Sequence, residues 1–157
     1  MRHRNLTLGG TALLAALAID QASKALIVAE AARLAGGVPV VPGFNLVFGR
    51  NPGVTFGLFG DVPWWVLALV AAAICAWLLQ LMIAAGTRTE AVAAGLIVGG
   101  ALGNVVDRLR FGAVTDFLDF YAGTSHWPAF NLADVAVVCG AALMILRPLF
   151  ADRAPVS

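Results

Sequence analysis

The sequence predicts an all-α membrane protein with four transmembrane helices and a small β-layer at one membrane face. Of its 157 residues, 61% are hydrophobic and only 12% are charged, and the mean hydropathy is +0.89, whereas a soluble domain is about 25% charged. Four apolar stretches approach the roughly 20 residues that a helix needs to cross a bilayer. Two long connections rich in Gly, Pro, Val and Phe separate them. We therefore expect residues 1–157 to form a single integral-membrane domain.

The four predicted spans lie at approximately 6–28, 63–85, 91–106 and 132–150. The start of the first resembles a secretory signal, but apolar residues resume after Lys24, so we expect this helix to remain uncut. In the third, Gly95, Gly99 and Gly103 recur every four residues and share one face, where small residues allow another helix to approach closely.

The connections differ in length and indicate an orientation. The turn at 86–90 is short, and the two long connections lie on the opposite membrane face. Residues 36–59 contain too many Gly and Pro for a helix and predict short strands on the membrane surface. Each face has five Lys or Arg residues, but Lys24 and Arg108 adjoin acids. Setting these two aside favours cytoplasmic termini and an outer β-layer.

Acidic residues in apolar surroundings are costly and therefore mark pairing or chemistry. Asp20 and Lys24 have the i,i+4 spacing of a helical ion pair. Asp134 follows Asn131 by three positions, which also suits an ordinary capped helix start. The functional alternative is that Asp116 and Asp134 converge. One carboxyl group would then hold a proton while the other activates water for attack on a peptide bond.

Other chemistries find little support in the sequence. The only histidines are His3 and His126, and no H-E-x-x-H or other metal-ligand spacing occurs. Ser23 is adjacent to Lys24, and neighbouring helical residues do not face each other. The net charge of +1 gives no basic field for nucleic acid. A small ion-coupled transporter and a non-catalytic assembly module remain alternatives to a peptidase.

Five motifs taken together resemble the lipoprotein signal peptidases (signal peptidase II). They are 20–24 (DQASK), 51–57 (NPGVTFG), 103–108 (GNVVDR), 114–119 (VTDFLD) and 130–134 (FNLAD). The resemblance implies a multi-pass aspartic endopeptidase of the bacterial inner membrane with its site near the outer face. It would cut diacylglyceryl-modified prolipoproteins just before the lipidated Cys, among membrane lipids, without cofactor or metal. We expect a monomer.

The resemblance also implies roles for individual residues. The catalytic pair would be Asp116 and Asp134. The binding or supporting residues would be Asn51, Gly53, Asn104, Asp107, Arg108, Asn131, Asp20 and Lys24. We expect Arg108 to contact substrate or a lipid headgroup, and Asn51 and Asn131 to hold backbone amides. One departure is 54–55 (Val-Thr), where the family usually has two small residues.

Overall fold

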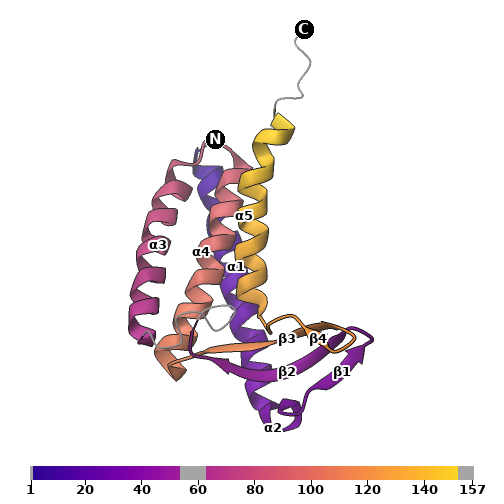
Figure 1. The fold of residues 1–157 in the computed structure, drawn as a ribbon. Coiled ribbons are helices and arrows are strands. Elements are labelled where there is room, and N and C mark those ends of the chain that lie inside the picture. The colour runs from indigo at the N-terminus through magenta and orange to yellow at the C-terminus, as the bar shows by residue number, and fades with distance from the viewer. Residues whose placement is uncertain (1, 54–62, 152–157) are drawn as a thin grey trace.

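A computed structural model describes residues 2–53 and 63–151. The described residues form four long helices that lie side by side, with a small sheet at one end (Figure 1). The helices are α1 (Arg2–Ala29), α2 (Ala31–Leu34, one turn), α3 (Trp64–Ala84), α4 (Arg88–Phe111) and α5 (Leu132–Ala151). The strands are β1 (Val38–Val41), β2 (Phe44–Asn51), β3 (Val114–Ala122) and β4 (Ser125–His126).

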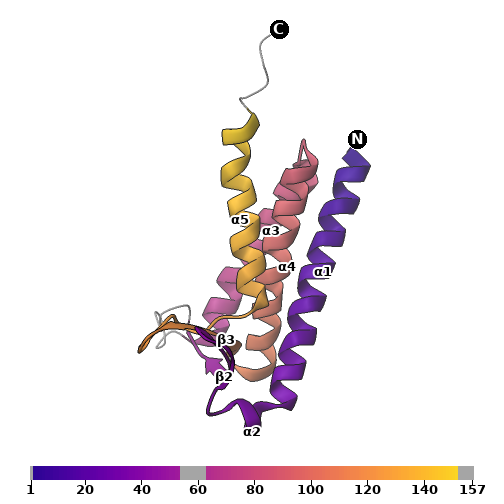
Figure 2. The same ribbon diagram turned by 90° about the vertical axis from the view of Figure 1, so that its right-hand side faces the viewer.

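Helix α4 is the centre of the bundle and packs against α1, α3 and α5 (Figure 2). Its glycines bring the backbones into contact. A Cβ on Gly95 would lie 2.2 Å from the carbonyl oxygen of Gly9, and one on Gly100 would lie 2.3 Å from that of Ala133. The predicted glycine face therefore packs against α1, and Gly100 provides a second close approach, to α5.

Helix α4 is longer than the third predicted span, 91–106. It begins at a capping box, in which the Thr87 hydroxyl accepts from the Glu90 amide and the Glu90 carboxylate accepts from the Thr87 amide. It ends at Gly112, whose φ of 68° is the left-handed conformation that glycine adopts readily. Asp107 and Arg108, which follow the predicted span, are part of the helix. They lie inside it because buried polar partners compensate for their burial.

The sheet is antiparallel, with strand order β1-β2-β3-β4. The β2–β3 pairing is interrupted by an irregularity between Leu46 and Gly49. A further bridge joins Leu118 to Phe130, with the Leu118 amide donating to the Phe130 carbonyl over 2.8 Å. This bridge places the segment just before α5 beside β3.

The sheet lies at one end of the bundle. The first residues of α1, the α3–α4 turn and the last turns of α5 lie opposite the sheet (Figure 1).

Within the described part of the chain, three helices are long and apolar enough to cross a membrane: His3–Ala29, Trp65–Ala84 and Arg88–Phe111. The fourth predicted span coincides with helix α5.

Candidate active site

Asp116 lies on β3 and is almost completely buried, with 5% of its surface exposed. The side-chain amide of Asn131 donates to its Oδ1 over 2.7 Å, and that of Asn51 donates to its Oδ2 over 3.0 Å. Burial raises the pKa of the Asp116 carboxyl group to about 6. The two amide bonds oppose this rise, and the nearby Asp134 charge adds to it. Asp116 is therefore a carboxyl group that can hold a proton close to neutral pH.

Asp134 lies in the first turn of α5, where a capping arrangement holds it. The Asn131 Oδ1 accepts from the Asp134 amide, and the Asp134 Oδ2 accepts from the Asn131 amide, both over 3.1 Å. Asn104 of α4 donates to the Asp134 Oδ1 over 2.9 Å. The predicted helix cap at Asn131 is confirmed, and it presents the carboxylate beside the positive end of the helix dipole.

Both carboxyl groups line one cavity of about 230 Å³. No direct hydrogen bond joins them among the described residues. Instead Asn131 contacts both and also donates to the Asn104 Oδ1 over 3.3 Å. The lining also has an apolar part, which comes from Ala71, Ala101 and Val137. A water molecule takes up about 30 Å³ in the liquid, so the cavity has room for water beside a peptide group.

Behind the cavity lies a buried ionic cluster centred on Lys24. Its Nζ is 3.0 Å from the Asp20 Oδ2 and 3.7 Å from the Asp107 Oδ2, and it donates to the Asn104 Oδ1 over 2.9 Å. The Lys24 bond occupies the Asn104 oxygen and leaves the Asn104 amide to face Asp134. The predicted i,i+4 pair of Asp20 and Lys24 is confirmed, and the contacts of Lys24 with Asp107 and Asn104 join α1 to α4.

The two acids of this cluster also hold backbone on either side of the cavity. Asp20 Oδ1 accepts from the Ala133 amide over 2.9 Å, and Asp107 Oδ2 accepts from the Thr115 amide over 2.8 Å. Ala133 immediately precedes Asp134, and Thr115 immediately precedes Asp116. The cluster therefore fixes the backbone of both cavity carboxyl groups.

Arg108 joins α4 to the turn after β2. Its Nη2 donates to the Gly53 carbonyl over 2.7 Å, and the Gly53 amide donates to the Asn51 Oδ1 over 3.0 Å. The side chain is 7% exposed and lines the cavity, and its Nε has no hydrogen-bond partner among the described residues. Arg108 therefore lies at the cavity wall and ties it to the turn after β2.

Nine of the ten predicted site residues line the cavity or belong to the ionic cluster, and the tenth, Asn131, joins the two cavity carboxyl groups. Two of the ten make hydrogen bonds beyond those expected. Asn51 and Asn131 do hold backbone amides, but their side-chain amides also donate to Asp116. Sequence reasoning missed Gln21, which donates to Asp20 and Asp107. Its place in the DQASK motif was the available signal. The segment 54–55 lies outside the described residues.

Asp119, three residues after Asp116, belongs to a separate cluster on the sheet. Its carboxylate contacts the Nδ1 of His126 at 2.8 Å and accepts from the Asn45 side-chain amide over 2.9 Å. Burial raises the pKa of this carboxyl group, but the bonds from His126 and Asn45 outweigh it and the pKa is lowered. Asp119 is therefore an ionised acid outside the cavity.

Comparison with known proteins identifies the family. The family model described as signal peptidase (SPase) II matches residues 12–150. The chain is 46% identical over 138 residues to the lipoprotein signal peptidase of Aeromonas hydrophila subsp. hydrophila, covering 83% of this chain and 81% of the relative. It is 45% identical over 158 residues to that of Methylorubrum extorquens, covering 94% and 89%.

Solved structures agree with the fold. A bacterial membrane enzyme determined by the in meso method superposes with a TM-score of 0.81 at 26% identity, over 95% of this chain and 94% of that one. A second superposes with a TM-score of 0.76 at 28% identity, over 90% and 92%. The extent of the match, together with the five motifs around one cavity, shows that the chain belongs to the signal peptidase II family.

Proposed function

We propose that Asp116 and Asp134 are the catalytic carboxyl groups of this enzyme, an aspartic endopeptidase that removes signal peptides from prolipoproteins. The observation that carries the proposal is that both line one cavity and are joined by Asn131. The transporter and assembly-module alternatives do not account for the family match.

The surroundings of the two carboxyl groups support different roles for them. Asp134 lies in the first turn of α5 and accepts from the backbone N–H of Asn131 and from the side-chain amide of Asn104. Asp116 is buried and receives two neutral amides, and its pKa is raised to about 6. We therefore assign Asp134 as the general base and Asp116 as the general acid of the first step. The titration belongs to the pair as a whole.

The reaction follows from this assignment. Asp134 removes a proton from water as the water oxygen attacks the peptide carbonyl carbon, and Asp116 donates its proton to the carbonyl oxygen. The resulting neutral diol collapses when Asp116 takes back a hydroxyl proton and Asp134 gives its proton to the leaving nitrogen. The products are a signal-peptide carboxylic acid and a free amine. Both carboxyl groups return to their starting states without a covalent intermediate.

The supporting residues act through position. Asn51, Asn104 and Asn131 orient the carboxyl groups. Asp20, Lys24 and Asp107 form the ionic cluster that fixes the backbone beside them. Arg108, held by Gly53, lines the cavity, where its guanidinium can meet the polar part of the substrate or a lipid headgroup.

The membrane arrangement is part of the same proposal. Residues 1–157 form one domain with four transmembrane helices in the bacterial inner membrane, working as a monomer among membrane lipids. The shared end of α1, the α3–α4 turn and α5 supports cytoplasmic placement of both termini (Figure 1). The sheet and the cavity then lie near the outer face. There a diacylglyceryl-modified substrate can keep its acyl chains in the bilayer while the bond before the lipidated Cys reaches water.

The test is cleavage of a diacylglyceryl-modified prolipoprotein by purified protein, followed by mass spectrometry of the products. Asp116→Asn and Asp134→Asn should each lower the rate by roughly 10²–10⁴-fold, the usual contribution of a general acid or base. Asp119→Asn is the matched control, because it changes an acid of the same strand outside the cavity, and it should cleave normally. A near wild-type rate for either dyad variant would refute the assignment.

A further inference from the structure

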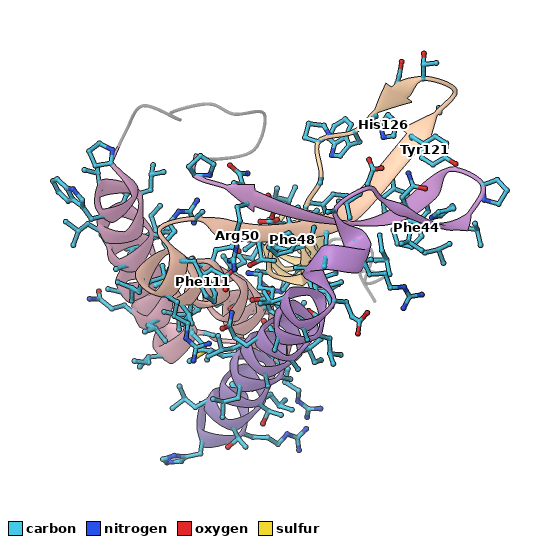
Figure 3. All side chains as sticks on the ribbon, turned by 90° about the horizontal axis from the view of Figure 1, so that it is seen from below. Phe44, Phe48, Arg50, Phe111, Tyr121 and His126 are labelled. Atoms are coloured by element: carbon cyan, nitrogen blue, oxygen red, sulfur yellow. The ribbon has the colours of Figure 1, made fainter. Side chains whose placement is uncertain are left out.

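Arg50 connects the end of β2 to two other elements. Its Nη1 donates to the Thr115 Oγ1 of β3 over 2.8 Å. Its guanidinium carbon lies 3.9 Å from the ring centre of Phe111, the last residue of α4, and 5.4 Å from that of Phe48. Figure 3 shows the side chains of Arg50, Phe48 and Phe111 together where the sheet meets the bundle. None of these contacts is with Asp116 or Asp134.

The position of Arg50 matters because Asn51 is the next residue. In the β2–β3 ladder Arg50 pairs with Thr115 and Asn51 pairs with Val114, beyond the irregularity between Leu46 and Gly49. This last part of the ladder carries the Asn51 amide that donates to Asp116. Its register therefore decides whether that amide reaches the carboxyl group.

We infer that Arg50 is a positioning residue: by stacking on Phe111 and bonding to Thr115, it holds the end of β2 so that the Asn51 amide stays on Asp116. The inference rests on the proposed catalytic role of Asp116. Thr115 is fully buried and is bonded at both ends, through its backbone to Asp107 and through its hydroxyl to Arg50. The contact therefore joins β2 to the same backbone that the ionic cluster fixes.

The arrangement requires arginine and not simply a positive charge. A planar guanidinium can lie over an aromatic ring while its edge donates a hydrogen bond. A lysine ammonium can reach Thr115 or Phe111 but does not present a flat face. Arg50→Lys should therefore behave more like Arg50→Ala than like the wild type.

The chain offers a matched control on the same pair of strands. Asn45 of β2 donates to Asp119 of β3 over 2.9 Å, so Asn45→Ala and Arg50→Ala each remove one side-chain bond between β2 and β3. Only Arg50 adjoins Asn51. Thermal unfolding of the purified full-length variants in detergent shows that both are folded before their kinetics are compared.

With the prolipoprotein assay, Arg50→Ala should lower kcat roughly tenfold, about the effect of losing one ordinary hydrogen bond to a catalytic group. Its KM should stay within about twofold, and Asn45→Ala should match the wild type. In an Asn51→Ala background, Arg50→Ala should have little further effect, because both changes remove the same contact. Equal activity of Arg50→Ala and Asn45→Ala, or a full tenfold further loss in that background, overturns the inference.

Asp116→Asn in the same assay separates this inference from the function on which it rests. If Asp116→Asn is inactive and Arg50→Ala cleaves normally, only the role of Arg50 is refuted. If Asp116→Asn cleaves at the wild-type rate, the catalytic assignment and the role of Arg50 both fail.

Discussion

Replacing Gly99 with alanine tests whether direct backbone contact between α1 and α4 holds the bundle together. A Cβ at this position would lie 2.4 Å from the Leu13 carbonyl oxygen and 2.9 Å from the Ala16 Cβ. Gly10 is the matched control, because it is also a helical glycine and a Cβ there meets nothing within 4 Å. The two substitutions add the same atom to a crowded and to an open position.

The size of the effect follows from these distances. Ordinary van der Waals contact begins at 3.4 Å, so α1 and α4 must move about 1 Å apart near Gly99. Overpacking of this kind costs about 1–3 kcal/mol. Glycine to alanine in a helix gains up to about 1 kcal/mol from helix propensity, and this gain cancels when the two variants are compared. Gly99→Ala should therefore be less stable than Gly10→Ala by about 1–3 kcal/mol.

The measurement is the free energy of unfolding of both variants in the same detergent. Peptidase activity should fall as well in Gly99→Ala, because α1 carries the Lys24 ammonium that contacts Asn104. If Gly99→Ala is as stable as Gly10→Ala, the close approach of the two helices does not have the role argued for it.

Three further predictions concern the site. Asp20→Asn removes the carboxylate that lies 3.0 Å from the buried Lys24 ammonium, and it should lower the free energy of unfolding by about 3–5 kcal/mol. A variant with normal stability but no activity would instead place Asp20 in the active site. Asn131→Ser keeps an oxygen that can cap α5 but loses the amide donor to Asp116, so kcat should fall at least tenfold while the unfolding temperature changes little, and retained activity would contradict the role of Asn131. The pKa of Asp116 is raised from 3.8 to about 6, so its contribution to stability is complete below pH 3.8 and is lost as the pH rises to about 6, by about 3 kcal/mol in total. The free energy of unfolding of Asp116→Asn should lack that loss over this pH range. Equal slopes of unfolding free energy against pH for the variant and the wild type would contradict the prediction.

Much of the framework could be predicted from local patterns. The spacing of Asp20 and Lys24 predicted their ion pair, and Asn131 and Asp134 have the spacing of a capped helix start. These predictions succeeded because each depends on residues one turn apart on a single helix. Apolar length likewise gave the positions of the long helices.

The contacts between distant elements could not be predicted in the same way. Asn51 and Asp116 are 65 positions apart, and their contact depends on strand pairing and on an irregularity that the sequence does not reveal. The predicted third span also stopped at residue 106, because the charged residues Asp107 and Arg108 interrupt the apolar stretch, although both are buried and helix α4 continues to Phe111. For the same reason nothing local indicated that Arg50 stacks on Phe111.

The joint role of Asn131 has a consequence for how the enzyme is made. The cavity takes one acid from β3 and the other from α5, and the residue that joins them precedes the final helix. A nascent chain that has inserted α1, α3 and α4 already contains Asp116 but has no second carboxyl group beside it. In the proposed mechanism, hydrolytic activity would therefore arise only when the last helix docks against α4, and partly synthesised copies would not cut neighbouring proteins in the membrane.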